Sequence, residues 1–521
     1  MDRQSGILMP IFSLPSKYGA GSFGKESYKF VDFLCKAGQR VWQILPLVQT
    51  GYGNSPYSSV SAESFNPYFI SIDILKEKKL LKNDEVAYAV TDGFYVNYGR
   101  LYSTRYPLLR KAFSRFDVKD KDFVKFLKKG KYRDYALYMA IKTITNYKPF
   151  YEWDEGLRYR DERTLKAFEK ENANEVAFWN FVQYEAEREW EALKKYANEK
   201  GVAIMGDMPL YVALDSVDVW VNPQLFKLDE NFRPTKVAGV PPDYFSRTGQ
   251  LWGNPVYDYE KHKEDNFAWW TERLKNALKK YDYVRIDHFR GLDRYYEVEN
   301  GRPDATVGEW VDVPSEELFD NVHKQVDGDR IIAEDLGIID DGVRELLAYT
   351  GYPGMKILSF AFNGEKDNLY LPENIEENSV CYTGTHDNDA LAGLIRSAND
   401  WDKGNFYRGV KHSLELAGID IELTDDESLV RAIIELGFSC KAKLFILPLF
   451  DAVGAGTEYR INEPGTVKEQ NWAVRADSSF MSTEIAGKLK KLSVRYKRFT
   501  DPKKKTAPSK KSASSNKKSC K

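Results

Sequence analysis

Residues 283–287 read YVRID, a short β-forming run that ends in a carboxylate. Seven further runs of this kind are spread along the chain, at residues 6–12, 41–45, 202–207, 330–334, 355–360, 379–383 and 442–447. Each is short, apolar and bounded by turn residues, and helix-like or loop-like stretches separate them, a pattern typical of parallel strands covered by helices. Eight such units fit a (β/α)8 TIM barrel, although periodicity alone leaves an open, doubly wound α/β sheet as an alternative.

The intervals between these runs are uneven. Residues 75–200, between the second and third runs, are rich in Lys, Glu and Tyr and have helical periodicity at 133–147 and 176–200, so we expect a large, mostly helical insertion there. Residues 225–259 carry Pro, Gly and Asp, and we expect a long loop of the kind that often covers a binding site.

Composition excludes several classes of partner. The net charge is −2, so no overall field attracts nucleic acid or an anionic membrane. Residues 501–521 contain eight Lys and one Asp among Ser, Pro and Ala, and are predicted to form a disordered basic tail on an acidic body. No stretch is long and apolar enough to span a bilayer, and the apolar run at the N-terminus is short and broken by prolines.

The four cysteines are Cys35, Cys381, Cys440 and Cys520, and they form no CxxC pair. Three of them lie in or beside apolar sequence, which favours reduced, mostly buried thiols in a soluble, cytoplasmic protein.

Carboxylates stand at the ends of several of the predicted strands. Asp207, Asp287 and Glu334 end the third, fourth and fifth runs, and Asp387 follows the seventh run in GTHDND. In a parallel barrel, side chains at the carboxyl ends of the strands converge on one mouth. A single such acid is as readily explained as a helix N-cap, but several together, two of them beside a histidine, favour a functional cluster.

Glycoside chemistry uses two carboxyl groups with opposed protonation states, one ionised at the anomeric carbon and one protonated at the leaving oxygen. Arg285 and Asp287 share one face of a strand, so we expect the guanidinium to hold Asp287 ionised. Glu334 follows three apolar residues, which are expected to favour its neutral form. A purely structural Arg285–Asp287 ion pair is the alternative when these two residues are taken alone.

The remaining polar motifs point to no cofactor. His262, His323 and His412 lie on polar, helix-like segments and are expected at the surface. The chain has five histidines and no HxH or HExxH pattern, so no metal site is predicted, and no GxGxxG or Walker sequence indicates a nucleotide.

Six stretches together resemble one known family. They are RIDHFRG (285–291), AEDLG (333–337), GTHDND (384–389), TGYGNSPYSSVSAESFNPYFISI (50–72), AGVPPDYFSRTGQLWGNPVY (238–257) and RINEPGTVKEQNWAVR (460–475). The chain is similar, from about residue 6 to about residue 480, to the 4-α-glucanotransferases called amylomaltase or disproportionating enzyme, glycoside hydrolase family 77 of the α-amylase clan. It departs from the family pattern at Ala390, where Thr is usual, and at Val313, where Gly is common before Pro314; neither departure touches a catalytic group.

The resemblance implies roles for particular residues. Asp287 is expected to be the nucleophile, Glu334 the general acid/base, and Asp387 the group that holds the sugar hydroxyls at C2 and C3. The expected substrate-binding residues are Arg285, His386 and Asp207 beside these acids, Tyr57 against the ring before the scissile bond, Asp243, Tyr244 and Phe245 on a loop that folds over the site, and Asn462.

The resemblance also implies an activity. It predicts retaining transfer of α-1,4-glucan segments by double displacement, with malto-oligosaccharides and α-1,4-glucans as donors and acceptors, glucose as a further acceptor, and no cofactor, nucleic acid or membrane. Residues 1–500 are expected to be the catalytic barrel, with 75–200 as its helical insertion and 225–259 as its substrate-covering loop. An α-1,4-glucan hydrolase with the same residues, and a glucan-binding protein without catalysis, are the alternatives; oligomeric state is left open.

Overall fold

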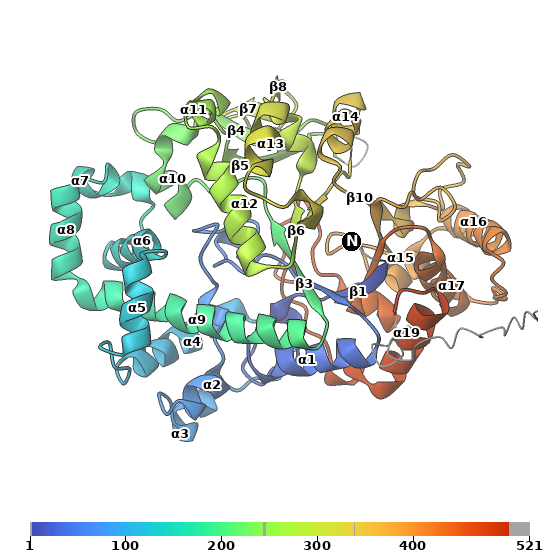
Figure 1. The fold of residues 1–521 in the computed structure, drawn as a ribbon, viewed down its shortest axis with the longest axis horizontal. Helices are drawn as coiled ribbons and strands as arrows, with labels where there is room; N and C mark the ends of the chain where they lie inside the picture. Colours follow the sequence, from blue (N-terminus) through green and yellow to red (C-terminus); the bar gives the residue numbers. More distant parts are fainter. Residues whose placement is uncertain (1–2, 243–245, 338, 500–521) are drawn as a thin grey trace, which may run out of the picture.

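The structure, a computed structural model, describes residues 3–242, 246–337 and 339–499. Its centre is a sheet of eight parallel strands (Figure 1): β1 (Gln4–Leu8), β2 (Val41–Gln43), β3 (Ala203–Met208), β6 (Tyr283–Ile286), β9 (Ile331–Ala333), β10 (Gly354–Ile357), β11 (Ser379–Tyr382) and β12 (Leu444–Pro448). Each of the eight runs predicted from the sequence overlaps one of these strands.

The strands follow one another around a barrel. Their hydrogen-bonded order is β10-β11-β12-β1-β2-β3-β6-β9, which is the chain order after one cyclic shift. The two end strands, β9 and β10, are consecutive along the chain, and the amide of Ala333 donates to the carbonyl of Pro353 at 3.0 Å across the seam between them. An open doubly wound sheet reverses its strand order at a switch point, so this alternative is excluded and the predicted (β/α)8 barrel is confirmed.

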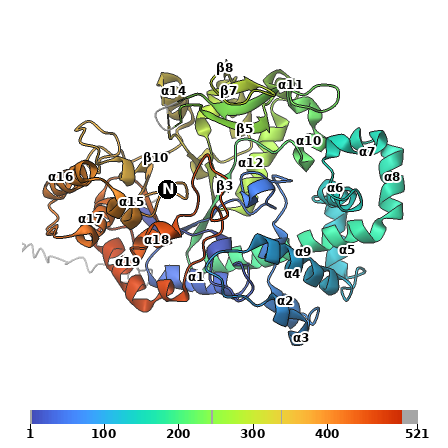
Figure 2. The same cartoon turned by 180° about the vertical axis from the view of Figure 1, so that it is seen from behind.

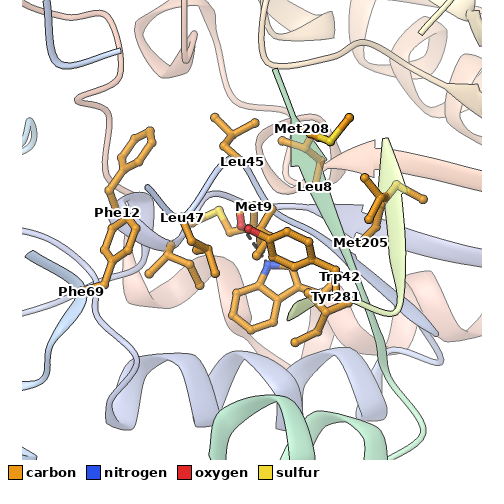
Figure 3. Packing of buried hydrophobic residues seen from close by; sticks show 14 of the residues in the cluster. Leu8, Met9, Phe12, Trp42, Leu45, Leu47, Phe69, Met205, Met208 and Tyr281 are labelled. Carbon is orange, nitrogen blue, oxygen red and sulfur yellow. Dashed lines mark hydrogen bonds between the residues drawn. The ribbon is translucent and has the colours of Figure 1, made fainter. Parts of the chain in front are cut away.

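Helices surround the barrel and bury its outer face. They include α1 (Lys25–Lys36), α9 (Ala173–Glu199), α12 (Ala268–Lys280), α13 (Ser315–His323), α14 (Asp341–Thr350), α15 (Leu391–Ser397), α16 (Asp400–Ala417), α17 (Asp426–Ser439), α18 (Leu449–Ala452) and α19 (Thr483–Arg495). Trp42 of β2 shows how the layers join: its ring lies 4.9 Å from Phe30 of α1, and its indole N–H donates to the carbonyl of Met9 at 2.8 Å (Figure 3). Within the described ranges, no helix combines the length and the apolar character needed to cross a membrane.

The connection from β2 to β3 is mostly helical, as predicted. Before α9 it contains α2 (Ile72–Glu77), α3 (Asn83–Val86), α4 (Tyr98–Phe113), α5 (Lys121–Lys129), α6 (Arg133–Ile144), α7 (Glu155–Arg158) and α8 (Glu162–Glu171). Figures 1 and 2 place α5 to α8 on one side of the barrel, away from α16, α17 and α19 on the other. The long helix α9 links the insertion to the barrel, since it packs against α6 at one end and leads into β3 at the other.

A second sheet lies beside the barrel and was not predicted. It has four antiparallel strands in the order β5 (Gln250–Pro255), β4 (Lys236–Val240), β7 (Arg294–Glu299) and β8 (Glu309–Asp312). The expectation of a long loop over residues 225–259 is therefore wrong for β4 and β5. Both strands contain glycine, which weakens the β pattern, and β4 finds its partner β7 more than fifty residues further along the chain.

His262 is a second correction. It was expected at the surface, but its side chain is fully buried among Tyr257, Trp269 and Trp270, and burial lowers its pKa to about 4. It lies on α11 (Tyr259–Glu264), a short helix of otherwise polar residues that turns Tyr259 and His262 inward together. Residues three positions apart lie on the same face of a helix, so the burial of Tyr259 places His262 in the interior as well.

Candidate active site

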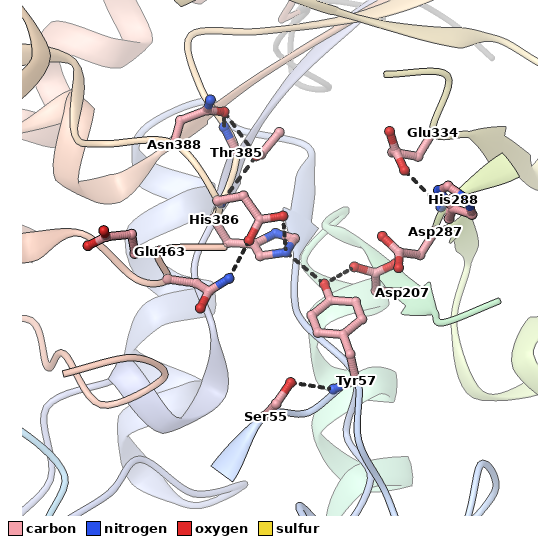
Figure 4. Close-up of polar contacts among 12 residues, drawn as sticks. Ser55, Tyr57, Asp207, Asp287, His288, Glu334, Thr385, His386, Asn388 and Glu463 are labelled. Atoms are coloured by element: carbon pink, nitrogen blue, oxygen red, sulfur yellow. Dashed lines mark hydrogen bonds and ion pairs between the residues drawn. The ribbon is translucent and has the colours of Figure 1, made fainter. Parts of the chain in front are cut away.

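The acids predicted at the strand ends meet at one mouth of the barrel. Ile286 of β6 pairs with Ala333 of β9, so Asp287 and Glu334 occupy the next position on two adjacent strands. Backbone hydrogen bonds fix both positions: Asp287 donates to the Met208 carbonyl and Glu334 to the Ile286 carbonyl, each at 3.0 Å. Figure 4 shows Asp207, Asp287 and Glu334 on one side of a shared space, with His386 on the other side.

Arg285 binds two of these acids at once. Its Nε and Nη2 lie 3.0 and 2.7 Å from the two oxygens of Asp207, and Nη2 lies 2.7 Å from Oδ1 of Asp287. The side chains of Arg285 and Asp207 are almost fully buried, whereas that of Asp287 is 28% exposed. The contact expected between Arg285 and Asp287 is therefore present. The same guanidinium also binds Asp207, and this second ion pair holds Arg285 in place beside the Asp287 carboxylate.

The pKa of Asp287 is raised well above its ordinary value, although opposing effects act on it. Burial and the nearby acids Asp207 and Glu334 raise the pKa of Asp287, while the Arg285 guanidinium acts to lower it. Arg285 thus favours the ionised form, as the sequence indicated, but it works against a site that is crowded with negative charge.

Glu334 is held by backbone amides. The N–H of His288 donates to Oε2 at 2.7 Å, and the N–H of Leu336 donates to Oε1 at 2.8 Å. Burial raises the pKa of Glu334, and these two amides together with Arg285 oppose the rise. The expectation of a raised pKa is met, but no sequence pattern indicates the two amide donors, which come from the turns that follow β6 and β9.

Tyr57 connects the two sides of the mouth. Its hydroxyl donates to Oδ2 of Asp207 at 2.6 Å, lies 3.0 Å from Nε2 of His386, and accepts from Nη2 of Arg285 at 3.4 Å. The Tyr57 ring stacks on the His386 imidazole with centroids 5.3 Å apart. Burial raises the pKa of Tyr57 and lowers that of His386, so the tyrosine keeps its proton and the imidazole is neutral.

Trp472 completes this aromatic group and was missed in the sequence. Its ring centroid lies 5.6 Å from that of Tyr57 and 5.8 Å from that of His386. Its backbone has φ of 61°, a left-handed conformation that is rare for a bulky residue. The sequence feature that could have identified Trp472 is its position in residues 460–475, which resemble the family. A single tryptophan does not by itself indicate a functional site.

Asp387 is more exposed than Asp207 and Asp287, with 43% of its side chain accessible. Asn462 donates to its Oδ1 at 2.6 Å, Nε2 of His386 lies 3.4 Å from its Oδ2, and Arg460 donates to its backbone carbonyl at 2.8 Å. Asn462 is therefore in the site, where its amide orients Asp387. An accessible carboxylate held by fixed partners is well suited to accept hydrogen bonds from a polyol.

Three predicted residues, Asp243, Tyr244 and Phe245, lie outside the described residues. Among the described residues, no group of three or more His, Cys, Asp and Glu side chains is arranged to hold a metal ion. The site has the groups needed for acid–base and nucleophilic chemistry at a sugar. These are two carboxyl groups at adjacent strand ends, a buried guanidinium beside one of them, and a more exposed carboxylate opposite.

Comparison with known proteins agrees with this geometry. A sequence model of glycoside hydrolase family 77, described as 4-alpha-glucanotransferase, matches residues 9–480. The chain is 43% identical to a 4-alpha-glucanotransferase of Clostridium butyricum over 94% of this chain and 100% of the relative. It is 40% identical to a 4-alpha-glucanotransferase of Thermus thermophilus over 95% of this chain and 98% of that protein.

A solved structure gives the same result. An amylomaltase from Streptococcus agalactiae, solved in complex with acarbose, superposes with a TM-score of 0.89 at 36% identity, over 96% of this chain and 100% of the other. The family match covers far more than half of the chain and contains the strand-end acids, Tyr57 and Asn462. The chain belongs to glycoside hydrolase family 77, the 4-alpha-glucanotransferase family.

Proposed function

We propose that this protein is a retaining 4-α-glucanotransferase, which moves α-1,4-glucan segments between malto-oligosaccharides or longer glucans of the starch and glycogen type. The observation that carries the proposal is the placement of Asp287 and Glu334 at equivalent positions on adjacent strands, with Arg285 bonded directly to one of them. Membership of the family and the names of its relatives support the transferase over a hydrolase.

The two carboxyls take different roles in this proposal because their contacts differ. Asp287 has a cation at 2.7 Å, and Glu334 has backbone amides as its direct partners. Two close carboxyls in a buried site resist double ionisation, so the pair retains one proton. The ion pair keeps the negative charge on Asp287, and the proton resides on Glu334.

In the first step, Asp287 attacks the anomeric carbon and Glu334 protonates the departing 4-oxygen. This gives a covalent glycosyl-enzyme of inverted configuration and releases the glucan that carried the leaving oxygen. Asp387 binds hydroxyls of the sugar ring at the same centre, where Asn462 holds its carboxylate in place. Retention of this kind uses carboxyls roughly 5–5.5 Å apart.

In the second step, Glu334, now ionised, removes the proton from the 4-hydroxyl of an incoming glucan, and that oxygen attacks the anomeric carbon. A second inversion restores the α linkage and frees Asp287. The energy of the old glycosidic bond is retained in the new one, so no activated sugar is required. Glucose, which has a free 4-hydroxyl, serves as the smallest acceptor in this scheme.

A sugar acceptor must compete with water, which is far more concentrated. Orientation of a bound acceptor can supply several kcal/mol, up to about 7–11 kcal/mol in the best cases. In this proposal residues 1–500 form the catalytic barrel and the segment 225–259 covers the substrate. We also place the protein in the cytoplasm, a location that the free, buried thiols of Cys381 and Cys440 favour.

Incubation with maltotriose tests the activity. A transferase yields glucose together with maltotetraose, maltopentaose and longer products, and it incorporates isotopically labelled glucose at their reducing ends. A hydrolase yields glucose and maltose without longer chains. The Asp287→Asn variant is the matched control, and products that persist at the wild-type rate in this variant would refute the assignment of the nucleophile.

A further inference from the structure

Asp335, the residue after Glu334, binds the strand that closes the barrel. Its side chain is 6% exposed, and the backbone N–H of Met355 in β10 donates to its Oδ1 at 2.6 Å. Glu334 is held from the other side, since its own amide donates to Ile286 of β6 and its carboxyl accepts from the amide of His288. The two neighbouring residues therefore bind in opposite directions around the cylinder.

The bond from Met355 to Asp335 stands where a bond between two backbones is expected. In a regular parallel ladder, a residue donates to the adjacent strand and accepts from the residue two positions further along that strand. Ala333 donates to the carbonyl of Pro353 at 3.0 Å, so its own carbonyl would accept from Met355. The Met355 N–H donates to the Asp335 carboxylate instead. Since β9 and β10 stand at the two ends of the continuous ladder, this side chain helps to close the barrel between them.

A glycine at position 354 makes room for the carboxylate. A Cβ on Gly354 would lie 2.5 Å from Oδ2 and 2.8 Å from Oδ1 of Asp335, closer than atoms that are not bonded to each other approach. Gly354 is the buried first residue of β10, and a glycine inside a strand often marks such a close approach. The carboxylate and the β10 backbone are therefore in direct contact, and one added methyl group would force them apart.

The contacts of Asp335 bear on both sides of Glu334. Ala333, which precedes Glu334, and Asp335, which follows it, both bind β10. The next residue, Leu336, supplies the backbone amide that donates to Oε1 of Glu334 at 2.8 Å. Nζ of Lys356 lies 3.7 Å from Oδ2 of Asp335 and adds an ion pair to the same contact. A shift of Asp335 would therefore move the chain next to Glu334 and one of the two amides that hold its carboxyl.

We propose that Asp335 is a positioning residue for Glu334, and that its bond to the Met355 amide keeps the Glu334 carboxyl at the place where it can exchange a proton with the sugar oxygen. This role rests on the proposed function, in which Glu334 is the general acid/base. Asp335 itself does not touch the reacting atoms in this scheme. A displacement of about 1 Å in a reacting group can lower a rate by about 100-fold, so a bond of this kind has a measurable effect on turnover.

The test compares two donors in the Asp335→Ala variant of the full chain. Maltotriose needs Glu334 as an acid and then as a base, whereas α-maltosyl fluoride with azide as the acceptor needs neither. We expect kcat on maltotriose to fall about 10- to 100-fold, while turnover of the fluoride with azide is unchanged. Asp335→Asn keeps an oxygen that accepts the Met355 N–H, so it should recover most of the rate on maltotriose. An equal loss with both donors, or no recovery with Asn, overturns the proposal.

Gly354→Ala tests the same contact from β10, and it should also lose turnover of maltotriose while keeping that of the fluoride. Gly487→Ala is its matched control, because a Cβ at this position in α19 has no neighbouring atom within 4 Å. Asp282→Ala is the control for the acid. Its carboxylate also accepts an amide of the next strand, that of Ile204 at 2.8 Å, but it precedes β6 and so lies at the end of the barrel away from the site. That variant should lose stability and keep the wild-type ratio between the two donors.

Hydrogen exchange tests the bond independently of activity. The Met355 amide should exchange faster in Asp335→Ala than in the wild type, and Asp335→Asn should restore its protection. Circular dichroism checks that each variant is folded, and Gly354→Ala decides the question if Asp335→Ala is not. A wild-type protein that makes no longer products from maltotriose would refute the proposed function. A wild type that makes them, together with Asp335→Ala that makes them equally fast, would refute the role of Asp335 alone.

Discussion

The backbone N–H of His288 donates a 2.7 Å hydrogen bond to Oε2 of Glu334, so the residue that follows one catalytic candidate holds the other. His288 itself has φ of 52° and ψ of 49°, in the left-handed region. This conformation directs the His288 amide at Glu334, so the position of the Glu334 carboxyl depends on the backbone of one residue in an uncommon conformation.

Replacement of His288 with Val should separate this backbone effect from the effect of the side chain. A β-branched residue is disfavoured in the left-handed region, so we expect a loss of about 1–2 kcal/mol in the free energy of unfolding and a lower kcat. Asn tolerates this conformation and removes the same imidazole, including its contact with the Trp252 ring. Urea denaturation and maltotriose turnover should therefore rank Asn above Val; equal values for the two would show that the conformation is unimportant.

The roles of Asp287 and Glu334 can be distinguished with azide. With an α-maltosyl fluoride donor, whose leaving group needs no acid, Glu334→Gln should still form the glycosyl-enzyme, and azide should release an α-glycosyl azide. Asp287→Ala should instead give the β-glycosyl azide by a single displacement.

On maltotriose, loss of the general acid/base should lower kcat by about 10²- to 10⁴-fold. Glu463→Gln is the control, since this nearby carboxylate pairs with Lys468 and should leave turnover unchanged. The same azide anomer from both acid variants would rule out the division of roles.

The pH dependence of kcat/KM should respond to Arg285. Activity requires Asp287 ionised and Glu334 protonated, so it should fall at low pH as Asp287 gains a proton and at high pH as Glu334 loses one. Arg285 lowers the pKa of both carboxyls and bonds directly to Asp287, so its removal in Arg285→Gln should move both limbs to higher pH, the acid limb included.

Arg285→Lys keeps the positive charge and serves as the control for this shift. Initial rates across the pH range measure both limbs. An acid limb that stays in place in Arg285→Gln, or that moves equally in the two variants, would contradict the ion-pair argument.

Tyr57→Phe removes the hydroxyl that joins Asp207 to His386. A hydrogen bond to a charged group contributes about 1.5–3 kcal/mol, so we expect kcat/KM to fall about 10- to 100-fold. Tyr138→Phe is the matched control, because its hydroxyl, on α6 of the helical insertion, donates to another carboxylate, Asp215, at 2.6 Å. That variant should lose stability and keep its turnover; a similar loss of turnover in both would indicate a general packing effect.

Asp451 predicts a pH-dependent stability. Burial raises the pKa of this carboxyl to about 6 from 3.8, although Thr383 and the Leu391 amide donate to it. Because the folded state binds the proton more tightly, this contribution to stability is complete below the unfolded value and is lost as pH rises from about 4 to about 6. Asp451→Asn, neutral throughout, should gain about 2 kcal/mol relative to wild type between about pH 4.5 and pH 7 in urea denaturation.

The control for this effect is Asp161→Asn. Asp161 is the exposed N-cap of α8, and hydrogen bonds from Thr164 lower its pKa, so its replacement should have the opposite pH trend. A pH-independent difference between Asp451→Asn and wild type would show that the carboxyl is ionised at the same pH in both states.

The sequence predicted the barrel because parallel strands buried on both faces are continuous apolar runs, and all eight were visible as such. The strand-end acids could be predicted for the same reason, because a carboxylate at the end of an apolar run is unusual and therefore easy to recognise. The contact between Arg285 and Asp287 followed from their spacing of two along one strand. These are local patterns, which a single sequence records directly.

The parts that were missed depend on contacts distant in sequence. Tyr57 reaches His386 across 329 positions, and nothing in either segment indicates the other. The amide of His288 points at Glu334 because the residue has a left-handed backbone conformation, which its side chain does not predict. β4 and β7 are strands because they pair with each other. His262 is buried because aromatic side chains pack against the face of the helix on which it lies.

The barrel seam has a consequence for how the site adapts to a sugar. β6 is hydrogen-bonded on both edges, to β3 and β9, whereas β9 ends the continuous ladder and meets β10 through the bond from Ala333 to Pro353. Glu334 is the next residue after that joint. We therefore expect any opening of the barrel at this joint to shift Glu334 more than Asp287, so that adjustment to the oxygens of different glucans falls to the proton donor and not to the nucleophile.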